Sequence, residues 1–230
     1  MCVNRPFGVA KSERLLRNSM EEEKHLNVAH IWQLDPDSPI PEDQRRRMCA
    51  PASVNMILDF VFVKHGEYSF ALDDIVKEME SFGGRIVEYG WKHSAQVDTL
   101  KNHGLVAWRR NWLAPSQDPN YFIQNEGYNQ DQVEAFLHQL RQEDQDGDSL
   151  QDRAWFCIKQ SINNGLPVII SVKAGFSENE IGHMVVVSGY TKDAVEIVDP
   201  LLPPGEQKCV DRDYFWEYFK FQAIFVQAKS

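Results

Sequence analysis

The sequence predicts an α+β fold, with helices in the first half of the chain and an antiparallel sheet in the second. Apolar residues recur at helical spacing between residues 50 and 104, and short β-branched and aromatic runs separated by turns fill the last third. A chain of 230 residues, 43% of them hydrophobic and 25% charged, is long enough to bury a core in one domain.

The first half contains three predicted helices. Residues 1–27 are polar and form an arm or a lid, and 28–41 (VAHIWQLDPDSPIP) is a strand running into a loop. The helix from Pro51 is apolar on every side and ends at His65–Gly66, so we expect the rest of the domain to enclose it. Two more helices and a strand follow, at 69–84 with Ser69 as cap, at 94–104 with Gly104 as stop, and at 105–113.

The second half supplies the sheet. Two amphipathic helices are predicted at 131–142 and 150–165, with an acidic surface loop between them. The remaining segments are predicted strands and one helical turn: strands at 167–172, 183–190, 194–200 and 222–227, and the turn at 214–221.

Charge and cysteine usage exclude several classes of function. The net charge of −10, from 24 basic and 34 acidic residues, argues against a nucleic-acid or membrane-surface partner, because both attract basic proteins. The four cysteines have no zinc-site spacing, so we expect neither a metal nor a cofactor. The N-terminus lacks a signal-like apolar region, and no stretch approaches the roughly 20 apolar residues that cross a bilayer. The expected location is cytoplasmic, with reduced thiols.

Cys49 stands directly before the apolar helix, in RRRMCAPASVNMIL. The unpaired N–H groups and dipole of a helix N-terminus stabilise a thiolate, and a basic partner lowers its pKa from about 8.5 to roughly 3.5–7.5. The position therefore suits a nucleophile at the N-terminus of a buried, rigid helix. A small apolar residue at a helix start explains the same fragment equally well.

A histidine and an aspartate complete the candidate site. His183 begins one predicted strand and Asp199 ends the next, 16 positions later. If the two strands pair through the turn Thr191–Asp193, antiparallel pairing brings His183 and Asp199 together. A nucleophilic cysteine needs such a base and a group that orients it.

These residues carry a family resemblance. MCAPASVNMIL resembles the Cys-Gly-Pro-Ala-Ser helix start of the bacteriocin-leader (double-glycine leader) peptidase-like branch of papain-like cysteine peptidases, and GHMVVVSGYTKDAVEIVDP resembles its His-to-Asp-Pro hairpin. The resemblance spans residues 28–228, except for an apparent insertion at about 110–150. It implies a papain-like domain at 28–230, with the helical half packed on an antiparallel sheet.

The resemblance also implies roles for single residues. Cys49 is the nucleophile, His183 the general base and then acid, and Asp199 the group that orients His183. Gln44 is the oxyanion glutamine, although it lies five positions before Cys49 where about six is usual. Ala50 replaces the usual glycine, so both departures from the family pattern fall at the oxyanion site.

The leading hypothesis is a cysteine hydrolase that cleaves a peptide, isopeptide or other amide bond through an acyl-thioenzyme. Acyl transfer to an amine, and a non-catalytic binding module on the same fold, are the alternatives. The expected partner is a peptide or protein substrate; the oligomeric state is not predicted. The expected substrate-binding residues are Arg45, Arg46, Arg47 and Gly182, with a solvated turn as the alternative reading of the arginines. Five aromatic residues either line a cleft near the insertion or pack in the core or a hairpin: Trp91, Trp108, Trp112, Tyr121 and Phe122.

Overall fold

A computed structural model describes residues 23–62, 69–86, 90–112, 149–173, 182–206 and 208–227, together with Gln130. The predicted arm up to residue 22, the helix predicted at 131–142 and most of the insertion lie outside the described residues.

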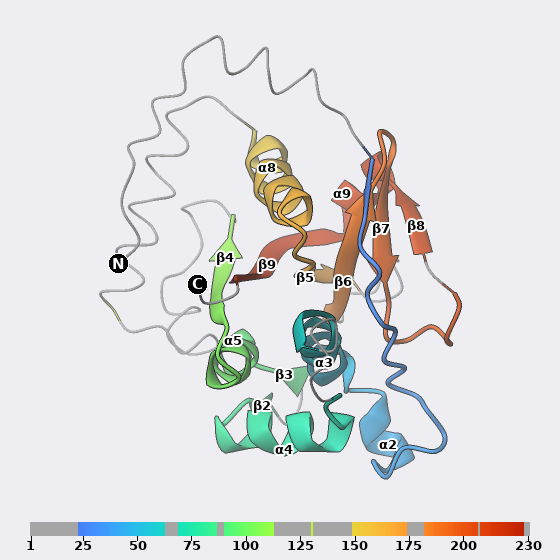
Figure 1. Cartoon of the computed structure of the whole chain (residues 1–230), viewed down its shortest axis with the longest axis vertical. Helices are drawn as coiled ribbons and strands as arrows, with labels where there is room; N and C mark the ends of the chain where they lie inside the picture. Colours follow the sequence, from blue (N-terminus) through green and yellow to red (C-terminus); the bar gives the residue numbers. More distant parts are fainter. Residues whose placement is uncertain are drawn as a thin grey trace.

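One antiparallel sheet organises the described part of the chain (Figure 1). Its strands follow the order β4-β9-β5-β6-β7-β8, and a short strand β1 pairs with β6 beside this path. The bounds are β1 Lys24–His25, β4 Val106–Asn111, β5 Val168–Lys173, β6 Gly182–Tyr190, β7 Ala194–Val198, β8 Lys208–Asp211 and β9 Phe219–Gln227. A two-stranded sheet, β2 (Arg85–Ile86) with β3 (Gly90–Trp91), stands apart from it. Helices and antiparallel sheet confirm the α+β class.

Helices cover both faces of the large sheet. The helices with described bounds are α2 Glu42–Arg45, α3 Cys49–Phe62, α4 Leu72–Ser81, α5 His93–Asn102, α8 Leu150–Asn163 and α9 Arg212–Tyr218, of which α2 buries no residue. Side chains of α3, α4 and α5 form one buried cluster with the sheet, and side chains of α8 and α9 form another. In β5, Ile169 belongs to the first cluster and Ile170 to the second. Burial on both faces explains why the central strands are apolar without alternation.

Helix α3 is enclosed, as its apolar sequence predicts. Every residue from Ala50 to Asp59 is buried. Its polar residues are held by the segment before α4: Asn55 Nδ2 donates to the Phe70 carbonyl at 3.0 Å, and Asp59 Oδ1 accepts the Phe70 N–H at 3.2 Å. Ser69 is not the cap of α4, a correction to the prediction, because its hydroxyl donates to Asp59 at 3.4 Å and the N-cap position is Ala71.

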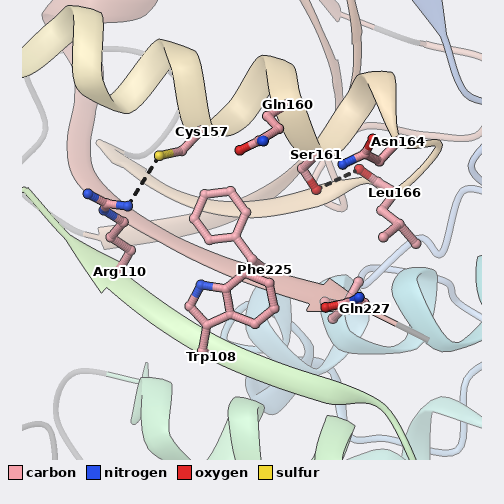
Figure 2. Close-up of a pocket in the computed structure, with 10 residues that line it drawn as sticks. Trp108, Arg110, Cys157, Gln160, Ser161, Asn164, Leu166, Phe225 and Gln227 are labelled. Carbon is pink, nitrogen blue, oxygen red and sulfur yellow. Dashed lines mark hydrogen bonds between the residues drawn. The ribbon is translucent and has the colours of Figure 1, made fainter. Parts of the chain in front are cut away.

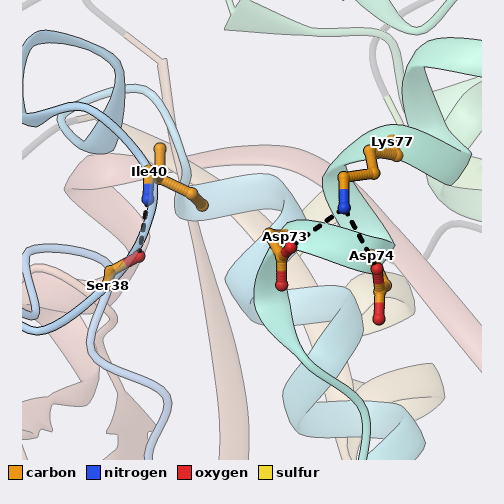
Figure 3. Close-up of polar contacts among 5 residues, drawn as sticks. All are labelled: Ser38, Ile40, Asp73, Asp74 and Lys77. Carbon is orange, nitrogen blue, oxygen red and sulfur yellow. Dashed lines mark hydrogen bonds and ion pairs between the residues drawn. The ribbon is translucent and has the colours of Figure 1, made fainter.

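The first turn of α4 is acidic instead of capped. Asp73 and Asp74 lie near the unpaired N–H groups, where negative charge stabilises a helix. Figure 3 shows Lys77 Nζ bonding to both carboxylates, at 3.0 and 3.3 Å. In the loop that leads to α2, also drawn there, Ser38 Oγ accepts the Ile40 N–H at 3.3 Å.

The strand predicted at the start of 28–41 is wrong. The strand lies earlier, at Lys24–His25, and the chain then binds the sheet through separate hydrogen bonds. The Leu26 N–H donates to Ser188 O at 2.8 Å, and the Gln33 N–H donates to Pro200 O at 2.9 Å. The physical reason is that β6 already pairs with β5 and β7. Since β5 pairs with β6 as far as Val187, only Gly189 and Tyr190 remain on that edge for pairing with β1.

Other predicted elements are confirmed. Helix α5 precedes Gly104, whose φ of 88° lies in the left-handed region suited to a helix stop, and β4 follows. The predicted hairpin is β6–β7, closed where the Thr191 N–H donates to Ala194 O at 2.9 Å. Strand β9 starts at Phe219, three residues earlier than predicted. In the described ranges, no helix has both the length and the apolarity needed to cross a membrane.

Candidate active site

Cys49 is the first residue of α3, as the sequence predicts. The helix is anchored before it by Met48, which is buried and whose carbonyl accepts the Ala52 N–H at 2.9 Å. The Cys49 thiol accepts hydrogen bonds from the backbone N–H groups of Ala50 and Met184 and contacts the His183 side chain. As a whole the residue is half-buried. The helix start thus holds a thiol against the sheet.

His183 and Asp199 meet at the open end of the β6–β7 hairpin. His183 Nε2 donates to Asp199 Oδ1 at 2.6 Å, and each side chain is only 3% exposed. The same carboxylate oxygen accepts the Leu201 N–H at 3.0 Å, which fixes the carboxylate. Since Nε2 faces a carboxylate, which only accepts, Nδ1 is left for the thiol of Cys49. The structure brings Cys49, His183 and Asp199 into one contact chain.

The electrostatics of this chain favour a charged pair. Burial raises the pKa of Cys49, but the hydrogen bond and charge of His183 and two backbone N–H groups outweigh it, so the pKa lies below its usual value. Burial lowers the pKa of His183, whereas Asp199 and Cys49 raise it to about 9. Burial raises the pKa of Asp199, but His183, the Leu201 N–H and the charge of Lys208 together bring it below its usual value. A thiolate facing an imidazolium backed by a carboxylate is the favoured state.

The segment from His30 to Gln33 stabilises the site, although no pattern in the sequence predicts this role. His30 Nε2 donates to the Asp199 carbonyl at 3.0 Å. Gln33 is fully buried; its backbone N–H donates to Pro200 O, and its Nε2 donates to Arg45 O at 3.0 Å. These bonds connect the loop after β7 to the segment before Cys49. The available signal was the amide of Gln33 inside the apolar run HIWQL.

Gln44 lies on α2 and is half-buried. Among the described residues, no hydrogen bond joins its side chain to Cys49 or His183. Gln44 therefore remains a predicted oxyanion donor that the structure does not bring into the contact chain.

The predicted substrate-binding residues differ in their surroundings. The guanidinium of Arg45 donates to the carbonyl of Asp35, so it holds the preceding loop. Arg46 and Arg47 are exposed. Gly182 is exposed at the start of β6, directly before His183. Of the four, Gly182 is the one joined by a peptide bond to a residue of the contact chain, His183.

A pocket of about 630 Å³ opens elsewhere, between α8 and the strands β4 and β9 (Figure 2). Trp108 lines it and stacks on Phe225, with ring centroids 5.7 Å apart. Trp112 is instead fully buried in the core, and Trp91 donates its indole N–H to Arg47 O at 2.8 Å. Of the three tryptophans that were candidates to line a cleft, Trp108 thus lines a cavity. Tyr121 and Phe122, their predicted neighbours, lie outside the described residues.

Solved structures resemble this chain in fold. A protein from Bacillus anthracis described as a C39-like peptidase matches with a TM-score of 0.55 and 18% identity, covering 91% of this chain and 99% of that one. A double glycine motif protease from an AMS/PCAT transporter, in complex with its leader peptide, matches with a TM-score of 0.48 and 14% identity. That match covers 90% of this chain and 95% of the protease. No curated protein matches the sequence.

A family comparison covers most of the chain. Residues 25–224 match the model of the Peptidase C39 like family. The match includes every strand of the large sheet except the start of β1 and the end of β9, and it includes the whole contact chain of Cys49, His183 and Asp199. The protein belongs to the Peptidase C39 like family.

Proposed function

We propose that the protein is a cysteine hydrolase that cleaves a peptide, isopeptide or other amide bond through an acyl-thioenzyme. The observation that carries the proposal is the hydrogen-bonded chain from the Cys49 thiol through His183 to Asp199. In this chain the hydrogen bond from His183 Nε2 to Asp199 Oδ1 is 2.6 Å long, and both side chains are buried. Family membership over residues 25–224 supports a peptide as the substrate.

The proposed reaction starts from the thiolate of Cys49. It attacks the carbonyl carbon, and the resulting tetrahedral oxyanion collapses with cleavage of the C–N bond. The His183 imidazolium gives its proton to the leaving amine, which leaves a thioester on Cys49. Neutral His183 then takes a proton from water as the water attacks the thioester. Collapse releases a carboxylic acid product and restores the thiolate and the imidazolium. Asp199 holds the ring orientation throughout.

A side-chain amide would stabilise the oxyanion in this scheme. Gln44 is the candidate implied by the family resemblance, and Gln33 is the candidate suggested by its burial and contacts. An amide NH₂ carries two protons, and Gln33 uses one on Arg45 O, so one donor remains. Its Oε1 is buried without a hydrogen-bond partner among the described residues. Such a donor is worth about 3–4 kcal/mol in the transition state.

Peptide cleavage tests the proposal directly. The full chain is incubated with a mixed peptide library, and new termini are identified by mass spectrometry. We expect Cys49→Ala and His183→Ala to lose at least about 1,000-fold in cleavage rate. Cys157→Ala is the matched control, because Cys157 lies on α8 outside the contact chain. Parental rates in both Cys49→Ala and His183→Ala would refute the proposal.

A further inference from the structure

The pocket between α8 and the strands β4 and β9 lies on the opposite face of the sheet from Cys49. Trp108 of β4 pairs directly with Phe225 of β9, and directly paired residues point to the same face of a sheet. Phe225 belongs to the buried cluster that contains side chains of α8 and α9, whereas Cys49 packs against the cluster that contains α3, α4 and α5. The sheet therefore separates the pocket from the thiol, so the pocket is a second site and not an extension of the candidate active site.

An aromatic surface forms one wall of the pocket (Figure 2). Trp108 is 43% exposed, and its indole stacks on the ring of Phe225, which is only 4% exposed. The buried ring supports the exposed one, so the indole presents a fixed apolar surface to the pocket. The face of an aromatic ring carries partial negative charge, which attracts the slightly positive C–H groups of a ligand.

Three side-chain amides line the same pocket. Gln160 lies in the last turn of α8, Asn164 is the C-cap of that helix one turn later, and Gln227 ends β9. All three residues are exposed, and among the described residues no hydrogen bond engages their side chains. Each amide offers two N–H donors and one carbonyl acceptor. The pocket can therefore both donate to a polar ligand and accept from it.

The other polar groups at the pocket already have partners. Arg110 Nη1 donates to Cys157 Sγ at 3.3 Å, and the guanidinium lies 5.3 Å from the centroid of the Trp112 ring. Ser161 Oγ donates to the Leu166 carbonyl at 3.0 Å. Among the described residues that line the pocket there is no Asp, Glu or Lys. These surroundings suit a neutral ligand better than a charged one.

We propose that this pocket binds a neutral saccharide. One face of a pyranose ring consists of C–H groups, which suits the indole of Trp108, and its hydroxyls donate and accept, which suits the three amides. The volume of about 630 Å³ lies within the roughly 300–1,000 Å³ of small-molecule sites. A nucleotide also stacks on tryptophan, but its phosphates need basic groups, and Arg110 is engaged. The proposal goes beyond the proposed function and does not depend on peptide cleavage.

Ligand-observed NMR on the full chain tests binding without requiring turnover. The probes are cellobiose, maltose, lactose and N,N′-diacetylchitobiose, which differ in linkage and ring substituents. Sorbitol is the matched control, because it has the hydroxyls without the ring. We expect at least one disaccharide to bind, with the strongest saturation transfer on its ring C–H protons, and sorbitol not to bind. Binding of none of the four disaccharides overturns the proposal, and so does equal binding of sorbitol.

A double variant, Gln160→Ala with Asn164→Ala, locates the site. Both residues are exposed, so the variant should fold as the parent does, which thermal melting checks. We expect its Kd for the bound disaccharide to rise about 5- to 100-fold, as for the loss of two neutral hydrogen bonds. Gln151→Ala is the matched control, because Gln151 is exposed at the other end of α8, away from the described lining, and should keep the parental Kd. An unchanged Kd in the double variant overturns the assignment.

Further measurements distinguish the saccharide from other occupants and other places. Trp108→Ala should raise the Kd at least about tenfold, because the apolar face of the sugar loses its contact. Cys49→Ala should bind the disaccharide with the parental Kd, since the sheet lies between Cys49 and the pocket. Loss of binding in Cys49→Ala would place the sugar at the candidate active site and overturn the proposal. Tighter binding of adenosine or of blocked trialanine than of any disaccharide, abolished by Trp108→Ala, would also overturn it, because the pocket would then take a nucleoside or a peptide.

Discussion

At the scale of single residues, Cys49 is controlled by opposing effects of its surroundings. Burial alone raises the pKa of its thiol, because a thiolate loses hydration when it is enclosed. His183 and the N–H groups of Ala50 and Met184 reverse that effect. His183 in turn keeps its proton because Asp199 and Cys49 both stabilise the imidazolium. The thiolate therefore depends on His183 more than on its place at a helix start.

This dependence predicts a distinctive pH profile for alkylation of Cys49 by iodoacetamide. Because the pKa of the thiol lies below its usual value, the rate should reach its plateau at a lower pH than the rate of an ordinary thiol does. A second inflection should appear near pH 9, where His183 loses its proton. In His183→Ala the burial effect loses its main opposition and keeps only the two backbone N–H groups, so the rate should rise at a clearly higher pH than in the parent. Mass spectrometry of the modified peptide gives the rate at Cys49 alone.

The control for this profile is a histidine elsewhere. His103 bonds to Glu78 at 2.7 Å on α4 and has no contact with Cys49 among the described residues, so His103→Ala should retain the plateau. The same digests report Cys209, whose pKa is raised by burial and by Glu196, as an internal reference that reacts only at high pH. A parental profile in His183→Ala would contradict the charged pair.

The two glutamines make different predictions for catalysis. We expect Gln33→Ala to lower kcat about 100- to 1,000-fold, the usual loss of one oxyanion donor, without slowing alkylation of Cys49. Gln44→Ala should change kcat only a few-fold if Gln33 is the donor. Steady-state kinetics on the best peptide, with thermal melting as a check on folding, distinguish them. The reverse pattern would assign the donor to Gln44.

Sequence patterns predict some of these residues and miss others for a physical reason. Cys49, His183 and Asp199 each lie at or next to the end of a regular element. Antiparallel pairing of the two hairpin strands brings His183 and Asp199 together. Gln33 makes its contacts with Arg45 O and Pro200 O, neither of which is specified by local periodicity. The bulge in β9 is also not predictable from residue type, because a phenylalanine rarely adopts the positive φ that Phe221 has there.

At the scale of elements, the contact between β1 and β6 requires a glycine. A Cβ on Gly189 would lie 2.4 Å from the Lys24 carbonyl oxygen and 2.5 Å from a Glu196 carboxylate oxygen. The backbone oxygen cannot move without displacing β1. Since β1 leads directly to His30 and Gln33, Gly189 also sets where the bracing segment begins.

Gly189→Ala should therefore detach β1 as well as reduce stability. We expect a loss of about 1–3 kcal/mol in the free energy of unfolding, the usual cost of overpacking. Trypsin should also cut after Lys24 faster under native conditions. Gly84→Ala is the matched control, because its Cβ would lie 2.4 Å from Ala95 Cβ, away from β1. It should lower the melting temperature but leave cleavage after Lys24 at the parental rate. Parental melting and cleavage in Gly189→Ala would contradict this role.

Element types were more predictable than element boundaries. Helices α3, α5 and α8 and strands β4 to β7 follow from apolar periodicity and from glycine stops. The strand expected at the start of 28–41 failed because the sheet offers that segment isolated hydrogen bonds instead of a free edge. Ser69 failed as a cap because a buried carboxylate, Asp59, competes for its hydroxyl. Both errors arise from tertiary contacts that override local preference.

At the scale of the whole molecule, the sheet separates two cores. The α+β class could be predicted because helical and β-rich segments are segregated along the sequence. The assignment of α3, α4 and α5 to one face and of α8 and α9 to the other could not, since periodicity gives a buried stripe but not the face it covers. Ile169 and Ile170 illustrate this: adjacent, equally apolar, and buried in different cores.

This layered construction has a consequence for inactivation. The thiol belongs to the helical layer and its histidine to the sheet, so their contact crosses the boundary between separately packed units. A slip of about 1 Å between the layers would leave each layer internally intact yet could reduce catalysis about 100-fold. The proposed hydrolase activity is therefore expected to be the property most sensitive to the relative position of the two layers. Under gentle heating, pressure or denaturant it should decay before any spectroscopic sign of unfolding.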